Sequence, residues 1–319
     1  MSLLAVGLQP QFAYGLHAVS GQIKRVSIAD LLVSRTAAYS LTCNAASQSI
    51  NFDFRSPTDI LGAVASDCNR LATACFQTAK GLDELFLNKD DMPWSLVKLY
   101  YASFYAGHFI LRALGQSCSF LDARHAARVN QYATAAGINI PFRFDAGLYN
   151  IELSPRATMF LCTKLQSQSS HDAFWSLFSI RWRQIAQAVL RGPLVPEEAQ
   201  AIFAQIDAFD RLMLRQRSYS WLSTFRNDIQ YRQKFDVWHP SGVTKRDREA
   251  IARLAGLWKL DPMSIDLSPT RLGTISDFVL CCCFMISVCR AVVTRLVALE
   301  KLTNRSFARY GPLLYLNGV

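Results

Sequence analysis

The sequence contains few of the residues from which metal sites and disulfide-linked secreted scaffolds are built. It has only five His among 319 residues, and its nine Cys form no C-x-x-C pair. Since no Cys lies at metal-ligand spacing from a His, we expect no metal site and no cofactor. The odd number of Cys and their apolar surroundings predict free thiols in a reducing compartment, where Cys serves as a small core residue.

Targeting and membrane signals are also scarce. The first residues lack the basic start and apolar stretch of a signal peptide. The most apolar run, residues 278–288 (FVLCCCFMISV), is eleven residues long and is bounded by the charged Asp277 and Arg290, so it is too short to cross a bilayer. We expect this run to be a helix buried on most sides, in a cytoplasmic protein with no membrane partner.

What the sequence does contain is abundant apolar residues and an excess of positive charge. The 319 residues are enough for one large or two medium-sized domains, and the 51% that are hydrophobic are enough for a sizeable core. The net charge is +10 and the isoelectric point is about 9.3. Such a charge favours a polyanionic partner, nucleic acid first, although many basic proteins use the same excess only for solubility.

The hydrophobic pattern predicts a mainly α protein. Residues 1–55 form a mixed N-terminal segment with a strand expected at 49–54 (SINFDF), and residues 303–319 form a C-terminal tail. Residues 56–302 are expected to be one helical domain, interrupted at about 116–171 by an insertion with strands at 138–144 and 149–153. Helical spacing and capping residues predict its helices at 57–79, 94–114, 122–136, 172–190, 196–217, 245–257 and 269–302.

One stretch concentrates residues suited to binding a phosphate. Residues 221–240 read WLSTFRNDIQYRQKFDVWHP, so Asn227 and Tyr231 lie one helical turn apart, with Arg226 and Arg232 beside them. Arginine forks bind phosphate with two hydrogen bonds and stack on bases, and a phenol donates to or accepts from the same group. The alternative is a buried polar network that only fixes the end of a helix.

Two motifs resemble the HEPN family, which consists of helical-bundle proteins of toxin–antitoxin, anti-phage and RNA-processing systems. Helix 98–115 (KLYYASFYAGHFILRALG) is similar to an aromatic-rich HEPN helix at Tyr100, Tyr101, Ala102, Phe104, Ala106, Leu111, Leu114 and Gly115. The family signature of an Arg, a polar residue, three variable residues and a His is matched by Arg226 and Asn227, but Tyr231 occupies the His position. The resemblance covers residues 57–115 and 172–300, leaving 116–171 as an insertion and the first 55 residues outside.

The resemblance implies a HEPN-like helical bundle. For active members of that family it also implies metal-independent ribonuclease activity. In active HEPN proteins two domains meet at one composite cleft, so the resemblance also implies a homodimer. By position Arg226 would hold the scissile phosphate and Asn227 would orient it. Tyr231 has an ordinary pKa near ~10 and is a poor base at neutral pH, so cleavage is expected to be weak or absent. His108, one turn from Arg112 on the aromatic helix, is a candidate for the missing imidazole.

Three functions follow as hypotheses. The first is an RNA- or nucleotide-binding protein of a bacterial defence or toxin–antitoxin system, with a partner from that system; the second is an active metal-independent endoribonuclease. The third is a structural subunit in which Arg226 is buried against an acid such as Asp228 or Asp236. For the first two, the residues predicted to bind nucleic acid are His108, Arg112, Arg215, Arg217, Trp221, Arg232 and Lys234.

Overall fold

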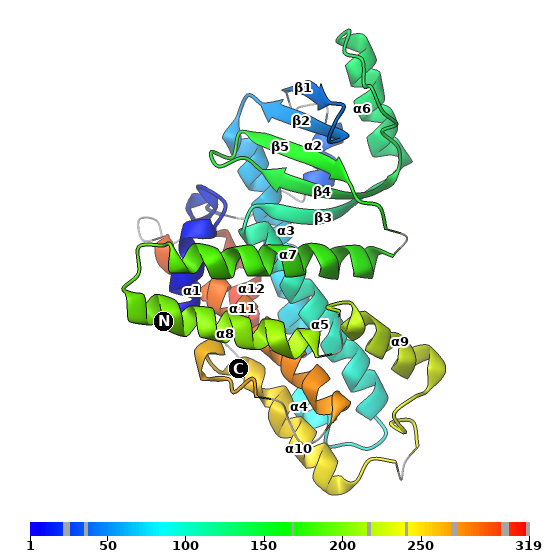
Figure 1. Cartoon of the computed structure of the whole chain (residues 1–319), viewed down its shortest axis with the longest axis vertical. Coiled ribbons are helices and arrows are strands. Elements are labelled where there is room, and N and C mark those ends of the chain that lie inside the picture. The colour runs from blue at the N-terminus through cyan, green and yellow to red at the C-terminus, as the bar shows by residue number, and fades with distance from the viewer. Residues whose placement is uncertain are drawn as a thin grey trace.

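The computed structural model of the protein describes residues 1–21, 26–34, 38–167, 169–215, 218–239, 242–268, 273–300 and 306–316. Of these residues 63% are helical and 11% lie in a five-stranded antiparallel sheet. The fold is therefore mixed α/β, and the expected mainly α bundle with only a small β-containing N-terminal segment is wrong. Figure 1 shows the sheet at one end of the molecule, with most of the helices at the other.

The sheet joins two segments that are far apart in the sequence. Its order is β1-β2-β5-β4-β3, with β2 paired to β5 through Ile50 and Cys162. The bounds are β1 Tyr39–Asn44, β2 Ser49–Phe54, β3 Gln116–Leu121, β4 Gly147–Leu153 and β5 Met159–Lys164. The hairpin from the N-terminal segment and the strands of the insertion thus complete one another, a long-range pairing that no local pattern reveals.

The strand expectations have different outcomes. The strand at 49–54 is confirmed, and residues 149–153 lie within β4. The strand expected at 138–144 is wrong because this segment is irregular. It contains Pro141, which has no backbone N–H to donate to a neighbouring strand.

One face of the sheet is buried and the other is open. Tyr39 lies on the buried face, where its hydroxyl donates to the Leu32 carbonyl of α2 (Ile28–Val33) at 2.7 Å. Its ring packs on Tyr132 of α6 (Ala123–Ala135), with ring centroids 4.9 Å apart. The opposite face carries polar residues such as Thr42, Asn51 and Asn150. This alternation of buried apolar and exposed polar residues determines which face of each strand packs on the helices.

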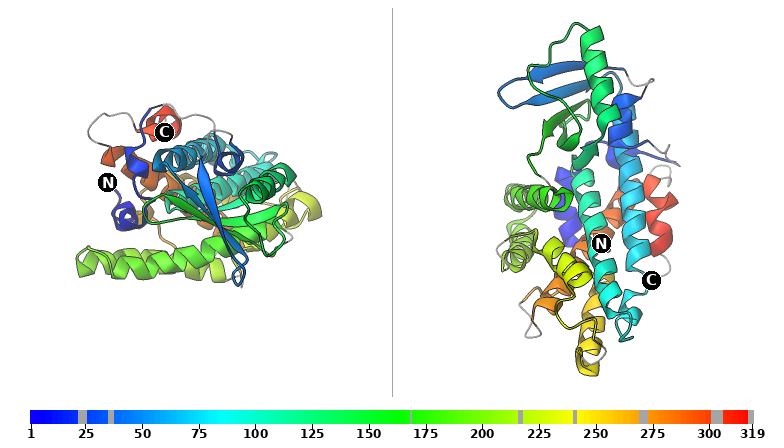
Figure 2. Two further views of the ribbon diagram at one scale, coloured as in Figure 1. Left: turned by 90° about the horizontal axis from the view of Figure 1, so that it is seen from above. Right: turned by 90° about the vertical axis from the view of Figure 1, so that its right-hand side faces the viewer.

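Three long helices form the centre of the helical part: α3 (Pro57–Ala79), α5 (Met92–Ala113) and α11 (Thr274–Leu299). As Figure 2 shows, α3 and α5 run side by side. Helix α11 is long and apolar enough to cross a membrane, but 89% of its apolar window is buried inside the protein. The expectation of a helix buried on most sides at 278–288 is confirmed.

The remaining helices surround this centre. Helices α7 and α8 lie side by side across the molecule (Figure 1), and α7 borders strands β3 and β4. The α-helical bounds are α1 Leu3–Leu8, α4 Leu82–Leu85, α7 Ser170–Leu190, α8 Pro196–Leu214, α9 Trp221–Arg232, α10 Lys245–Ala255 and α12 Pro312–Leu316. Short 3₁₀ helices are η1 Gln9–Gln11, η2 Leu16–Ala18, η3 Gly256–Lys259, η4 Pro262–Ser264 and η5 Phe307–Tyr310.

A glycine permits the close packing of α5 against α7 and α11. A Cβ atom added at Gly107 would lie 2.6 Å from Cζ of Phe174 and 3.0 Å from Cε of Met285. Any larger residue would separate the three helices or force Phe174 aside. This packing brings the N-terminal end of α7 against the aromatic side of α5, where the candidate site lies.

Candidate functional site

Helix α9 is anchored by its apolar residues. The Phe225 ring lies 4.3 Å from the ring of Phe278 in α11 and 4.5 Å from that of Phe235, measured between centroids. Trp221 also packs on Phe278, at 6.2 Å. Trp221, which was predicted to bind nucleic acid, therefore has its ring in the core. With this side of α9 buried, the next position, Arg226, is directed at the aromatic residues of α5.

The guanidinium of Arg226 is enclosed by aromatic and polar groups. The residue is 6% exposed, and its guanidinium carbon lies 5.2 Å and 5.4 Å from the ring centroids of Tyr100 and Tyr101. Nη1 donates to Oε1 of Gln230 at 3.3 Å, and Nη2 lies 3.4 Å from Nε2 of His171. Nε is buried without a hydrogen-bond partner. Cation–π contacts stabilise the charge in part, but they satisfy none of its N–H donors.

Arg226 has no acidic partner in the described part of the chain. Its hydrogen bonds reach only neutral groups, at Gln230 and His171. Asp228, suggested as a structural counter-ion, instead binds Arg232 and Lys234, each at 3.0 Å, and Asp236 is exposed. A buried cation without a counter-ion costs several kcal/mol, on the order of 3–5, which an incoming anion would offset.

His171 is the residue that sequence reasoning missed. It lies in the first turn of α7, 55 positions before Arg226, and its Nδ1 is 2.7 Å from the Tyr100 hydroxyl. Only the packing of α7 against α5 and α9 brings these residues together, and no local motif links them. The motifs point only to histidines close to them in sequence, such as His108.

The hydrogen bonds assign a tautomer to His171. Arginine is only a donor, so the Nε2 atom facing Arg226 must accept, and the proton resides on Nδ1. Nδ1 then donates to the Tyr100 hydroxyl, which also accepts from Nε1 of Trp175 at 3.2 Å and lies beside the Ser223 hydroxyl. Burial and the Arg226 charge lower the pKa of His171 below its usual 6.5. At neutral pH the imidazole is uncharged, and the electron pair on Nε2 accepts from the Arg226 guanidinium through a long, weak contact.

Tyr231 and Asn227 lie away from this arrangement. Tyr231 is 69% exposed, and five positions correspond to about 140° around a helix, so Arg226 and Tyr231 occupy different faces of α9. Asn227 is half-buried and shares the face of Tyr231. The structure brings together Arg226 and His171, rather than Arg226 and the residue at the motif position.

Of the other predicted binding residues, Arg215, Arg232 and Lys234 are exposed, and each is paired with an acid. Arg232 and Lys234 are exposed at the end of α9, tethered to Asp228. Arg215 donates to Asp277 of α11 at 2.7 Å, and Arg217 lies outside the described residues. Asp228 lies two positions from Arg226, about 200° around the helix, so Arg232 and Lys234 are held on the opposite side of α9 from Arg226.

His108 and Arg112 belong to a buried network between α3 and α5. Nε of Arg112 binds Oδ2 of Asp67 at 3.0 Å, and its Nη1 lies 3.1 Å from Nδ1 of His108. The His108 ring stacks on Phe174 with centroids 4.0 Å apart. Burial and the nearby charge of Arg112 keep the pKa of His108 well below 6.5, so this histidine is also neutral.

An exposed aromatic and basic stripe runs beside Arg226. Along α5, Trp94, Lys98, Tyr101 and Tyr105 recur at helical spacing; Trp94 and Lys98 are exposed and the two tyrosines are half-buried. Trp94 packs edge-on against Trp238, in the loop after α9, at 5.7 Å. Three aromatic rings with a cation among them suit a single-stranded nucleic acid, whose bases stack while a phosphate is neutralised.

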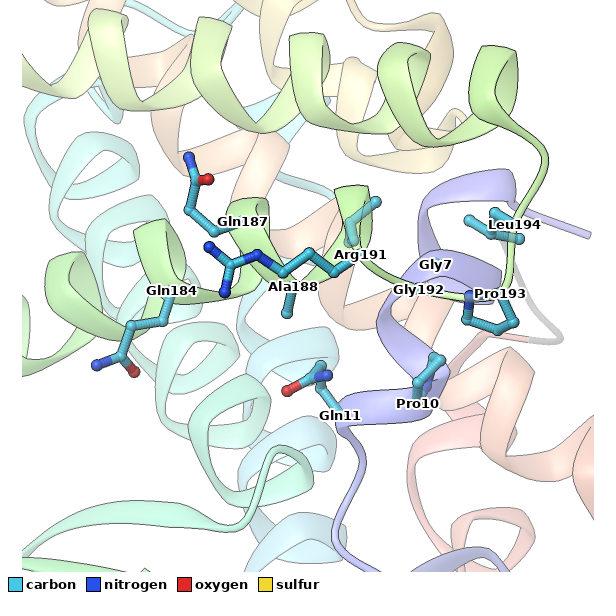
Figure 3. Close-up of a pocket in the computed structure, with 11 residues that line it drawn as sticks. Gly7, Pro10, Gln11, Gln184, Gln187, Ala188, Arg191, Gly192, Pro193 and Leu194 are labelled. Atoms are coloured by element: carbon cyan, nitrogen blue, oxygen red, sulfur yellow. The ribbon is translucent and has the colours of Figure 1, made fainter.

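The hollow between α1 and the C-terminal end of α7 lacks such an arrangement. Its volume is about 320 Å³, and Gln11, Gln187 and Arg191 line it without an acid (Figure 3). Residues that could hold a metal ion, in groups of three or more His, Cys, Asp or Glu, do not occur within the described ranges. No protein-family model, curated protein or solved structure matches this chain.

Proposed function

We propose that the protein binds single-stranded RNA and that Arg226 holds one of its phosphates. The observation that carries this proposal is the enclosed guanidinium with a free Nε and no acid among the residues described. A phosphate supplies both the missing charge and the missing acceptors. Gln230, whose side-chain oxygen is the one that bonds to the guanidinium among the described residues, is half-buried, so its weak 3.3 Å hydrogen bond can be exchanged for one to a phosphate.

The surface around Arg226 supports RNA rather than a small anion. Tyr101 and Trp94 provide flat faces for bases, and the exposed Lys98, one helical turn from each, provides positive charge between them. The HEPN resemblance of helix 98–115 and Arg226 extends this proposal to a role in a bacterial defence or toxin–antitoxin system. A cytoplasmic location, a homodimer and a partner from that system belong to the same proposal.

A second candidate function is metal-independent cleavage of RNA, and the neutral His171 favours it. Its Nε2 is unprotonated at neutral pH, as a general base must be, and lies 3.4 Å from Nη2 of Arg226. In this reaction the ribose 2′-oxygen attacks the phosphorus while its proton passes to Nε2. The bond to the 5′-oxygen breaks, that oxygen takes a proton from water, and the hydroxide left behind recovers the proton from Nε2. Arg226 stabilises the charge on the phosphate throughout.

One assay separates these functions. Labelled single-stranded RNA is incubated with the protein in EDTA, and binding by anisotropy and cleavage by gel are both recorded. We expect Arg226→Gln to raise Kd about tenfold or more, since a charged hydrogen bond is lost. Arg191→Gln, which removes an exposed charge elsewhere, is the matched control.

The outcomes discriminate clearly. Cleavage that falls about 100-fold or more in His171→Gln, but persists in Tyr231→Phe, establishes the ribonuclease. Binding without cleavage, weakened by Arg226→Gln alone, establishes the binding protein. If wild type neither binds nor cleaves RNA, the structural-subunit hypothesis takes precedence.

A further inference from the structure

A separate polar pocket lies where the open face of the sheet meets α7. Its cavity is about 320 Å³. Strand β3 contributes Gln116, β4 contributes Asn150 and Glu152, and α7 contributes Arg181. Gln116 and Glu152 are cross-strand neighbours, so both side chains emerge on the same face of the sheet. None of these residues belongs to the Arg226 site.

Two buried polar atoms at this pocket have no partner. They are Nε of Arg181 and Oε1 of Gln116, one a donor and the other an acceptor. Arg181 is held by Nη2, which donates to the Leu114 carbonyl at 3.3 Å, and by a long contact from Nη1 to Gln184. Buried polar atoms left unpaired cost about 1–3 kcal/mol each, so two at one pocket indicate that a partner is supplied from outside.

The carboxylate of Glu152 is oriented by its neighbours. Oε1 accepts from Nδ2 of Asn150 at 2.6 Å and from Nε2 of Gln116 at 3.4 Å. Gln116 Nε2 also donates to Oδ1 of Asn150 at 3.1 Å. Oε2 has no hydrogen-bond partner among the residues that the structure describes. Glu152 therefore presents a fixed, solvent-facing acceptor within the pocket.

The walls suit a flat ring. Leu177 and Ile180 of α7 and Leu153 of β4 line the pocket with apolar surface, and Ile180 is exposed despite its size. A flat heterocycle packed against these residues would place its polar edge at Arg181 and Glu152. The cavity volume is at the lower end of the range typical of small-ligand sites, which is suitable for one base.

The donor and acceptor types select among the bases. Arginine requires an acceptor on the ligand, whereas a carboxylate and the free Gln116 oxygen require donors. Guanine combines the acceptors O6 and N7 with donors on N1 and N2, and Arg to O6 and N7 is the commonest specific contact to a base. We propose that this pocket recognises a guanine base through Arg181 and Glu152, with Gln116 as an additional acceptor.

The proposal that this guanine belongs to RNA rests on the proposed function. Helix α7 carries both His171 and Arg181, ten positions and about 15 Å apart. One strand could therefore place a phosphate at Arg226 and a guanine at this pocket. A free guanine nucleotide has the same recognition chemistry, and the experiment includes it as a separate arm.

The test compares short RNAs that differ only in one central guanine. Kd is measured by anisotropy for U-rich RNAs with and without it, and by calorimetry for GMP, AMP, CMP and UMP. Wild type should bind the guanine RNA about tenfold more tightly than the guanine-free RNA. Glu152→Gln, which places an N–H₂ donor against guanine's donors, should remove that difference. Asp53→Asn removes a carboxylate from the same sheet face outside the pocket and should retain it.

The result also separates this inference from RNA binding itself. Arg226→Gln should weaken both RNAs equally and preserve their ratio. If wild type binds both RNAs with the same Kd, the guanine assignment is overturned while RNA binding stands. If RNA does not bind at all, selective GMP binding that Glu152→Gln abolishes still supports the pocket, and the absence of a GMP preference overturns it.

Discussion

The ion pair between Asp67 and Arg112 should be among the most sensitive points of the fold. It joins α3 to α5 with an Nε–Oδ2 distance of 3.0 Å, and its residues are 2% and 7% exposed. Asp67→Asn preserves the shape but leaves the Arg112 guanidinium facing only neutral groups, among them His108 and Ser119. We expect the free energy of unfolding to fall by about 3–5 kcal/mol, which is the cost of an unpaired buried charge.

Removing the cation of this pair should lower the free energy of unfolding by less than neutralising its acid. Arg112→Met leaves Asp67 paired with Arg70 at 2.8 Å, and the largely exposed Arg70 reaches solvent. The remaining carboxylate is therefore partly neutralised, and a loss of about 1–3 kcal/mol is expected. In the double variant no uncompensated charge remains, so its loss should be clearly smaller than the sum of the two single losses.

Denaturant unfolding followed by Trp fluorescence measures all three variants. Arg70→Gln is the control and should cost less than about 1 kcal/mol, because exposed ion pairs contribute little. A loss below about 1 kcal/mol in Asp67→Asn, or additive losses in the double variant, would refute the reasoning. Either result would mean that Arg112 is less buried in solution than its packing indicates.

Three further outcomes are expected. Gly107→Ala should lower the free energy of unfolding by about 1–3 kcal/mol through overpacking, whereas Gly62→Ala, in open helical surface, should be neutral or stabilising. Because His108 has a lowered pKa in the folded state, the unfolded chain binds more protons below pH 6.5. Stability should therefore decrease as pH falls through 6.5, by up to about 1.4 kcal/mol per pH unit, and His108→Leu should reduce this slope in urea unfolding at pH 5.5 and 7.5. In an NMR titration, Arg226→Gln should raise the pKa of His171 towards 6.5, and an unchanged value would contradict the contact between them.

Much of the helical part could be predicted from local signals. Pro57 begins α3, and acidic residues follow Pro196 at the start of α8, where the helix dipole favours them. Apolar spacing predicts α7 and α11, and it shows correctly that residues 278–288 are buried. Each of these signals involves residues within one or two helical turns of one another, so it can be recognised in a single sequence.

The sheet and the site depend on long-range contacts instead. The strand at 49–54 is visible locally, but its pairing with β5 joins residues more than a hundred positions apart. The same limit applies to His171, which reaches Arg226 only because α7 packs on α5. Tyr231 was favoured by its position in a motif, although helix geometry directs it to another face.

The salt dependence of RNA binding tests most directly whether Arg226 holds a phosphate. Kd for a single-stranded RNA would be measured from 50 to 300 mM salt for wild type, Arg226→Gln and the exposed control Arg191→Gln. Each phosphate contact on a single strand contributes a slope of about 0.7 to log Kd against log salt. We predict that Arg226→Gln weakens binding and lowers the slope by about this amount, while the control does neither. An unchanged affinity and slope in Arg226→Gln would contradict the proposed role of Arg226.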